Sequence, residues 1–310
     1  MRNGAKAMLH IQTPATTANV GPGFDCIGVA LQMYNHLWVE ETESGLRIEN
    51  RRRDVRVPLD GHNLVYASIL RFYKETGIQV PFKGIHLIQE DHIPQTRGLG
   101  SSAACIVSGL TAANALAGNR LSKPEIAEMA AIIEGHPDNA APAVLGGMVV
   151  AAMTNSRKLE YVKLDTTAMT TDGITFGVMV PDFPLSTGKA RKALPDTYSR
   201  ADVVFNTSRA ALMVAAVLTK DYDRLMTAMD DRIHQPYRSA IIPGMDEIFE
   251  KAKAAGALGV FLSGAGPTLV AVYKGTEARS GIMACLRSMK DKWILLELPP
   301  DMEGAQVKTL

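Results

Sequence analysis

The sequence is poor in cysteine, with 3 residues among 310. Cys26, Cys105 and Cys285 lie far apart, and no Cys-x-x-Cys pair is present. An odd number of isolated cysteines does not provide a disulfide framework, and it fits reduced thiols in a cytosolic protein. No two histidines stand at metal-ligand spacing either, so a structural zinc site is not expected.

An excess of one charge and long apolar runs are also missing. The 33 basic and 32 acidic residues leave a formal net charge of +1, which gives no general attraction to nucleic acid or to an anionic membrane. No uninterrupted run of about 20 apolar residues is present to cross a bilayer. Residues 1–6 lead into a strand-like segment without the apolar core of a signal peptide. We therefore predict a cytoplasmic protein that binds neither nucleic acid nor membrane.

A glycine-rich loop stands between a strand-like run and an alanine-rich helical run. Gly98 and Gly100 lack Cβ atoms, so an anion can contact the backbone closely there. Ser101 and Ser102 follow at the start of the helix, where free N–H groups and the helix dipole attract phosphate. We therefore predict a nucleotide-phosphate site formed by Pro94, Gln95, Thr96, Arg97, Gly98, Leu99, Gly100, Ser101, Ser102, Ala103 and Ala104.

Two other interpretations of this loop compete with the phosphate site. A tight turn with a serine N-cap occurs in many globular proteins. The spacing from Gly98 to Ala103 also fits the dinucleotide fingerprint, which requires a strand running into the first glycine and an acidic residue about 20 residues later. Pro94 and polar residues intervene here, and residues 112–121 contain no acid, so we reject NAD binding. No Walker sequence Gly-x-x-x-x-Gly-Lys-Ser/Thr is present.

The length of 310 residues predicts two domains. In the first, alternating and helical patterns are mixed, at 8–12, 37–43, 64–73, 84–89, 102–117, 123–133 and 148–152. In the second, the order is strand, helix, helix, strand, strand, helix, strand, which is that of a ferredoxin-like sandwich with one extra helix. These elements are expected at 175–180, 201–218, 245–255, 259–262, 268–272, 276–289 and 294–298. We predict an α+β protein with domains at 1–158 and 159–310.

Two further clusters carry candidate ligand-binding groups. The loop at 14–25 offers the amide of Asn19 and the carboxylate of Asp25, which is able to bind an ammonium group. Both are also common turn residues that bond their own backbone. In the segment 128–139, Glu128 lies within a predicted helix, and a carboxylate near Ser102 would complete a Mg²⁺ site. A solvated helix face is the alternative for Glu128.

The last two clusters lie in the second half of the chain. Residues 263–267 form a glycine turn between two apolar strands, either close to the phosphate loop or simply a hairpin connection. The segments 186–191 and 234–238 contain Arg191 and Arg238, whose guanidinium groups are able to bind a carboxylate in a bidentate manner. Taken singly, each arginine is more often a surface residue.

In this order, the four clusters resemble the motifs of the GHMP kinases. The block 134–143 is similar to the form found in the homoserine kinase branch of that family, and the resemblance extends from about Ile11 to Val272. It implies an N-terminal domain like domain 2 of ribosomal protein S5, a ferredoxin-like C-terminal domain and a homodimer. It also implies Mg²⁺-assisted transfer of phosphate from ATP to the side-chain hydroxyl of L-homoserine, on the route to threonine.

The resemblance implies roles for individual residues. Ser102 and Glu128 match the family positions that bind Mg²⁺, although motif position alone leaves the choice between Ser101 and Ser102 open. The backbone from Arg97 to Ala103 would wrap the triphosphate.

Five residues match the positions that surround homoserine: Asn19, Asp25, Asn139, Arg191 and Arg238. We assign Asp25 to the amino group and the two arginines to the carboxylate. Asn19 and Asn139 would orient the reacting hydroxyl. Asn139, Asn19 and Arg191 are the expected catalytic residues.

Asn139 also informs the mechanism, because mevalonate-type relatives carry an aspartate at this position. An amide cannot accept a proton, so we predict direct transfer without a side-chain general base, with Asp138 as the rival base. The alternatives to a homoserine kinase are a GHMP kinase acting on mevalonate or shikimate and a nucleotide-binding regulator without turnover. The intact loop and Glu128 argue against the regulator.

Overall fold

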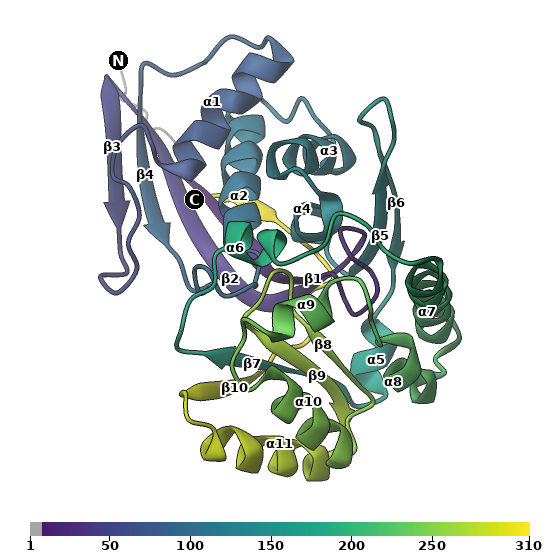
Figure 1. Ribbon diagram of the computed structural model, residues 1–310. Helices are drawn as coiled ribbons and strands as arrows, with labels where there is room; N and C mark the ends of the chain where they lie inside the picture. Colours follow the sequence, from purple (N-terminus) through teal and green to yellow (C-terminus); the bar gives the residue numbers. More distant parts are fainter. Residues whose placement is uncertain (1–7) are drawn as a thin grey trace.

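Two β-sheets with apolar residues on both faces produce a layered molecule (Figure 1). The computed structural model describes residues 8–310, and the expectation for residues 1–6 lies outside the described residues. In the first sheet the strand order is β11-β1-β2-β4-β3, and β5, which pairs with β6, is attached to β2. Its strands are β1 (Leu9–Ala18), β2 (Ile27–Thr42), β3 (Gly45–Asn50), β4 (Gly84–Glu90), β5 (Met148–Met153), β6 (Leu159–Leu164) and β11 (Gln306–Thr309).

Four helices cover one face of the first sheet (Figure 1). They are α1 (Leu64–Thr76), α2 (Ser101–Leu116), α3 (Lys123–Glu134) and α4 (Pro137–Leu145). Local sequence fixes their ends: the Asn63 side chain accepts hydrogen bonds from two N–H groups of α1, and Gly77 ends that helix in the left-handed conformation. Residues 123–133 and 64–73 are helical as predicted, whereas α4, which begins at Pro137, was not predicted.

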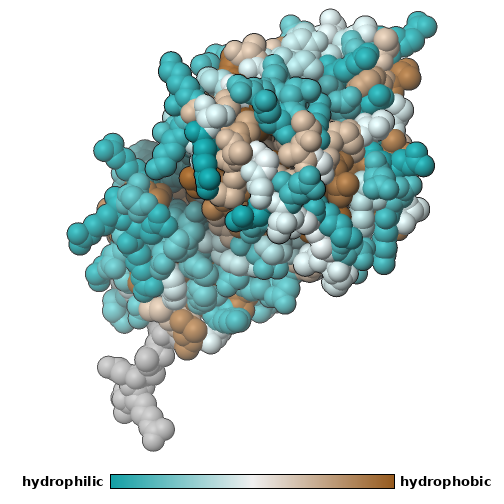
Figure 2. Space-filling view, turned by 90° about the horizontal axis from the view of Figure 1, so that it is seen from below, coloured by the Kyte–Doolittle hydropathy of each residue, from teal (hydrophilic) through white to brown (hydrophobic). Residues whose placement is uncertain are grey.

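The second sheet has the strand order β10-β7-β9-β8. Its strands are β7 (Ile174–Pro181), β8 (Gly259–Leu262), β9 (Leu269–Lys274) and β10 (Trp293–Glu297). Helices α10 (Met245–Ala254) and α11 (Thr276–Ser288) pack on one face through their apolar sides. Their outward sides are polar, and the molecule seen from below is mostly hydrophilic with hydrophobic residues in smaller patches (Figure 2). This arrangement confirms the predicted α+β class and the ferredoxin-like order of the second domain.

The second sheet packs its other face directly on the first sheet. In β7, Val178 and Val180 point to this interface, as does Phe176, and the intervening Met179 belongs to the core under α10 and α11. This alternation follows from the two-residue period of a strand. On the first sheet, Val29 and Leu31 of β2 complete the same core. The two domains therefore share one continuous apolar layer.

The chain crosses between the sheets later than the predicted boundary. Residue 158 lies in the hairpin that joins β5 to β6, and both strands belong to the first sheet. The crossing comes after Leu164, and β11 returns at the end of the chain to pair with β1. The division into 1–158 and 159–310 therefore differs from the sheet topology at both ends of the second segment. Strand β6 was not predicted, because residues 154–172 are mostly polar.

Shorter helices lie between β6 and β8 in the sequence. They are α5 (Thr167–Thr171), α6 (Thr187–Lys192), α8 (Leu225–Ala228) and α9 (Gln235–Ser239), with a 3₁₀ turn at Tyr222–Arg224. Two of them, α6 and α9, contribute residues to the site described below. Among the described residues, α7 (Arg200–Thr219) is the single helix long and apolar enough by composition to cross a membrane. One such helix is weak evidence for a span. It contains Arg209, and its Asn206 donates a hydrogen bond to Asp231.

Gly109 marks a close approach of α1 and α2. A Cβ atom at Gly109 would lie 2.4 Å from the carbonyl oxygen of Val65 and 2.7 Å from Cβ of Ser68. We expect Gly109→Ala to lower the free energy of unfolding by about 1–3 kcal/mol, because overpacking outweighs the better helix propensity of alanine. Urea unfolding followed by circular dichroism measures this change. Gly61→Ala is the control, since open space surrounds Gly61, and equal losses in both variants would contradict the prediction.

Candidate active site

A cavity of about 160 Å³ lies where the two domains meet. Its walls come from the start of α2, the loop after β1, the turn between α3 and α4, helix α6 and the turn between β8 and β9. The predicted site residues that line it are Asn19, Asp25, Pro94, Thr96, Arg97, Gly98, Gly100, Ser101, Ser102, Asn139, Arg191 and Arg238. Leu99, Ala103 and Ala104 are buried in the core, and Gln95 lines a neighbouring cavity.

The glycine-rich loop presents an open helix end to the cavity. Among the described residues, no side chain caps α2 at its N-terminus, so its first N–H groups are available to an anion. Gly98 and Gly100 have positive φ values of 77° and 70°. A Cβ atom on Gly98 would lie 2.3 Å from the carbonyl oxygen of Ser263, and one on Gly100 would lie 2.0 Å from Oγ1 of Thr16. The protein's own close contacts therefore also require these two glycines.

The second domain holds the loop in place. The Ser263 hydroxyl donates a hydrogen bond of 2.6 Å to the carbonyl oxygen of Gly98, and Thr268 N–H donates to the carbonyl oxygen of Arg97 at 3.2 Å. The Arg97 guanidinium donates to the carbonyl oxygens of Pro181 and Asp182 at 3.0 and 2.7 Å. Arg97 therefore contributes its backbone to the loop, and its side chain binds the end of β7. The turn at 263–267 lies against the phosphate loop, which was one of its two interpretations.

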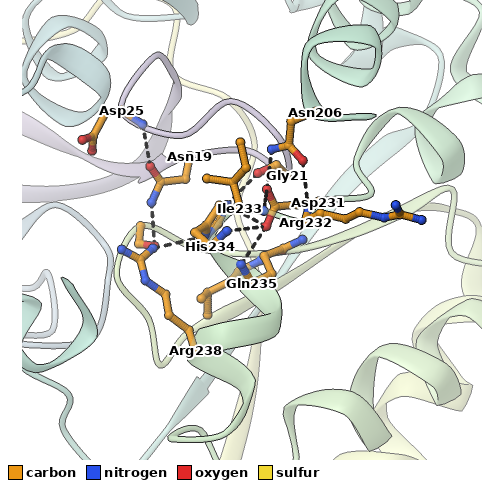
Figure 3. A network of polar contacts seen from close by, with 12 residues as sticks. Asn19, Gly21, Asp25, Asn206, Asp231, Arg232, Ile233, His234, Gln235 and Arg238 are labelled. Carbon is orange, nitrogen blue, oxygen red and sulfur yellow. Dashed lines mark hydrogen bonds and ion pairs between the residues drawn. The ribbon is translucent and has the colours of Figure 1, made fainter. Parts of the chain in front are cut away.

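Asn19 organises the loop that follows β1. Its φ of 67° is left-handed, and its carboxamide bonds backbone on both sides (Figure 3). Nδ2 donates to the carbonyl oxygen of Gly264 at 2.7 Å, and Oδ1 accepts from Asp25 N–H at 2.9 Å. Asn19 therefore links the first domain to the glycine turn and holds the backbone of Asp25.

Three charged side chains face one another in the cavity. The Arg191 guanidinium donates two hydrogen bonds to the Asp25 carboxylate, at 2.7 and 3.1 Å. Arg238 is 1% exposed and donates to the carbonyl oxygen of Gly264 at 3.0 Å. Burial, followed by the positive charge of Arg191, lowers the pKa of Arg238 to about 10. No carboxylate is hydrogen-bonded to Arg238 within the described part of the chain, so this guanidinium is suited to an anionic ligand.

The start of α4 provides the amide and carboxylate at the cavity floor. Asn139 lines the cavity: its Oδ1 accepts a 2.7 Å hydrogen bond from Thr16 Oγ1, and its Nδ2 donates one N–H to Asp138 Oδ1 at 3.4 Å. Asp138 is buried and accepts a hydrogen bond from Nδ1 of His136. Burial alone would lower the pKa of His136, but the hydrogen bond and charge of Asp138 outweigh it and raise the pKa. Sequence analysis did not assign a role to His136 or Thr16.

Known proteins are similar to this sequence over nearly its whole length. The GHMP kinases N terminal domain matches residues 63–147, and GHMP kinases C terminal matches residues 213–291. A homoserine kinase of Caldicellulosiruptor saccharolyticus is 43% identical over 304 residues, which cover 97% of this chain and 96% of that protein. The chain belongs to the homoserine kinase family of the GHMP kinases.

Solved structures agree with this assignment. The crystal structure of homoserine kinase from Cytophaga hutchinsonii matches with a TM-score of 0.85 at 29% identity, covering 99% of both chains. A putative homoserine kinase from Listeria monocytogenes matches with a TM-score of 0.79 at 34% identity, covering 97% of this chain and 99% of that one. The predicted family and the two-domain GHMP kinase fold are confirmed.

Glu128 does not lie beside Ser102 in this GHMP kinase, contrary to the expectation for the metal site. Its carboxylate accepts hydrogen bonds from Leu159 N–H at 2.8 Å and from Lys158 Nζ at 3.0 Å, outside the cavity. Glu134 lies there instead, and its Oε2 accepts a 3.1 Å hydrogen bond from Ser102 Oγ. The two glutamates are six residues apart, which separates them by about 120° around α3 and about 9 Å along it.

The helical period contains the signal that would have identified Glu134. It follows Ala127 by seven residues and Ala130 by four, and both alanines are buried, so Glu134 lies on the inward face of α3. Burial raises the pKa of Glu134. A carboxylate placed inward at the end of a helix is a stronger ligand candidate than the outward Glu128.

A buried carboxyl group precedes the phosphate loop. Asp91 is 3% exposed, and its Oδ2 has no hydrogen-bond partner among the described residues. Burial raises its pKa from 3.8 to about 6. Because the folded-state pKa lies above the unfolded value, this group favours folding at low pH, and the contribution is lost as the pH rises through about 6.

We expect Asp91→Asn, which removes this titration, to gain stability relative to the natural protein as the pH rises. The difference in unfolding free energy between the two proteins should grow by about 2–3 kcal/mol between about pH 4 and pH 7. Urea unfolding across this range measures the difference. A difference that stays constant with pH would show that Asp91 keeps an ordinary pKa.

Proposed function

We propose that this GHMP kinase transfers the γ-phosphoryl group of ATP to the side-chain hydroxyl of L-homoserine, giving O-phospho-L-homoserine for threonine formation. The observation that carries the proposal is the shared cavity, in which the uncapped end of α2 lies beside Asp25, Arg191 and Arg238. The homoserine kinases at about 40% identity support the choice of substrate.

The charges in the cavity suit an amino-acid zwitterion. Asp25 and Arg191 form an ion pair, and Arg238 has only neutral hydrogen-bond partners in the described structure. An incoming ammonium group would bind Asp25, and the carboxylate would bind both guanidinium groups. The ammonium group would take the place of Arg191 at Asp25, and the carboxylate would take the place of Asp25 at Arg191. Neither side chain would then lose its counter-charge. A ligand that lacks either charge would leave one of these side chains without a counter-charge.

A neighbouring cavity provides room for the base of the nucleotide. Its volume is about 260 Å³, and it shares Thr96, Ser101 and Ser102 with the phosphate loop. Val57 and Leu64 contribute apolar side chains to its walls. A nucleotide with its phosphates at the N-terminus of α2 would reach this cavity with its base.

Ser102 and Glu134 fit a Mg²⁺ ion. They place a hydroxyl and a carboxylate oxygen 3.1 Å apart at the end of α2, and oxygen ligands supplemented by water and phosphate are what Mg²⁺ requires. Burial raises the pKa of Glu134, and a cation bound beside it would favour the ionised carboxylate. Bound Mg²⁺ would neutralise phosphate charge. We therefore move the carboxylate role from Glu128 to Glu134 and keep Ser102.

The remaining residues position the reactants. Thr16 holds the Oδ1 of Asn139, so Asn139 would donate from Nδ2 to the homoserine hydroxyl and orient it. The N–H groups of α2 would stabilise the charge on the transferred phosphoryl group. Asn19 would act indirectly, since both ends of its carboxamide bind backbone. Asp138 is already bonded to His136, which favours transfer without a side-chain general base.

Mevalonate and shikimate are the rival acceptors, and neither carries an ammonium group for Asp25. We expect ADP release from ATP and Mg²⁺ with L-homoserine, and at least about 100-fold lower kcat/KM with mevalonate, with shikimate and with N-acetyl-L-homoserine, because each lacks the ammonium group that would pair with Asp25. A coupled assay for ADP measures this. Equal turnover of the acceptors that lack an ammonium group, or no turnover of any acceptor, would refute the proposed substrate.

Exchanging each glutamate separately tests the metal assignment. We expect Glu134→Gln to lower kcat about 100-fold or more and to raise the Mg²⁺ concentration needed for half-maximal rate, because an anionic oxygen ligand is lost. Glu128→Gln, the matched control on the same helix, should stay within about three-fold, since its carboxylate binds Leu159 and Lys158 outside the cavity. The reverse pattern would restore Glu128 as the ligand.

Two broader expectations remain part of this proposal. A cytoplasmic location fits a chain with isolated thiols and balanced charge. The homodimer follows from the family resemblance.

A further inference from the structure

The second domain contains a buried histidine beneath the carboxylate-binding arginine. His234 is fully buried and precedes α9. Its Nε2 lies 2.7 Å from the carbonyl oxygen of Gly21 in the loop after β1, and its Nδ1 lies 3.2 Å from Nη1 of Arg238 (Figure 3). The imidazole ring therefore connects a loop of the first domain to Arg238 of the second.

These two contacts determine the protonation of the ring. The Gly21 carbonyl oxygen only accepts hydrogen bonds, so Nε2 carries the proton. The Arg238 guanidinium only donates, so Nδ1 is unprotonated and accepts. A protonated ring would place an N–H against another N–H and a second positive charge beside Arg238. Burial and the charge of Arg238 lower the pKa of His234, while Asp231 and Asp25, the acidic groups that face it, act in the opposite direction.

The surroundings leave the ring little freedom to move. Asp231 accepts hydrogen bonds from the backbone N–H groups of His234 and Gln235 at 2.9 and 2.7 Å, which fixes the backbone on either side of the ring. Phe24 stacks on the imidazole at 5.4 Å between centroids and lies 5.3 Å from the Arg238 guanidinium carbon. A buried acceptor held this firmly directs one N–H of Arg238 away from the cavity and thereby fixes the plane of the guanidinium.

Gly21 is equally constrained at the other end of the connection. Its φ is 61°, and a Cβ atom there would lie 2.5 Å from the carbonyl oxygen of Met229. The position of its carbonyl group is therefore set by packing between the domains. Arg238 also donates to the carbonyl oxygen of Gly264, which binds Asn19. Both contacts tie Arg238 to the loop that carries Asp25.

We propose that His234 is a positioning residue for amino-acid recognition: as a neutral Nε2–H imidazole, it aligns Arg238 for the substrate carboxylate and couples that alignment to the loop bearing Asp25. The inference rests on the proposed function, because the carboxylate in question is that of homoserine. His234 itself touches neither substrate.

Kinetics of two variants provide the first test. We expect His234→Leu, which removes the acceptor and the donor, to raise the KM for L-homoserine about ten-fold or more, with the KM for ATP within about two-fold. His234→Gln offers an amide oxygen to Arg238 and an amide N–H to Gly21, and it should recover most of the loss. The control is His86→Leu, which removes a largely buried histidine on β4 outside the cavity.

The kinetic outcomes separate positioning from a general structural role. Equal increases in both KM values, or a glutamine variant no better than the leucine variant, would overturn the inference. Melting temperatures of all three variants identify any that fail to fold.

Nitrogen-15 NMR of the histidine side chains in the natural protein is independent of activity. The expected spectrum places His234 as the neutral Nε2–H tautomer from about pH 6 to pH 8, and a protonated or Nδ1–H ring would overturn the inference. If the natural protein releases no ADP with homoserine, the proposed function fails while the tautomer result still stands. If it does release ADP but the kinetic pattern above is absent, the positioning role fails alone.

Discussion

The apolar layer between the two sheets is the interaction on which the rest of the structure depends. Phe176 and Val178 of β7 pack against the face of the first sheet that carries Val29 and Leu31. A large apolar contact of this kind suppresses the relative motion that separate domains otherwise show. The hydrogen bond from Ser263 to Gly98 joins two loops from different domains. Such a contact keeps its geometry only because the layer beneath it holds the sheets in one arrangement.

Charge is distributed in the cavity so that ligand binding and protein stability oppose each other. Arg191 and Arg238 place two guanidinium groups in the cavity, and of the two only Arg191 is hydrogen-bonded to the Asp25 carboxylate. Burial lowers the pKa of Arg238, because keeping the charged guanidinium away from water costs free energy. Carbonyl oxygens of Ala190 and Gly264 offset part of it. The remaining deficit is what an anionic ligand of the kind proposed above would relieve.

Much of the fold follows from sequence periodicity because the apolar faces are regular. The second sheet was predictable strand by strand, since Val178 and Val270 each stand in short, continuous apolar runs bounded by turns. The strands that were missed are those whose exposure hides the pattern. In β6, Tyr161 and Val162 are respectively half-buried and exposed, and β11 is short and polar. Their place in the sheet depends on contacts with distant strands.

The sequence predicted which residues line the candidate site, but it did not predict which of them bind one another. Motif resemblance located Asp25, Arg191 and Arg238 together, and the structure lines one cavity with them. It does not predict that Asp25 and Arg191 bind each other, because 166 residues separate them in the chain. The expectation that Glu128 lies beside Ser102, where the structure places Glu134, had a different cause. Position within a motif was used where the helical period, with Ala127 and Ala130 as markers of the inward face, was the better guide.

The return of β11 to the first sheet has a consequence for biosynthesis. During translation the N-terminal part emerges first, yet β1 lacks its outer neighbour until Gln306–Thr309 leave the ribosome. The ferredoxin-like segment can complete its own four strands earlier, because β10 ends at Glu297. Residues 306–309 therefore close the first sheet after both sheets have formed their other strands, and a chain that stopped after β10 would leave an unpaired edge at β1.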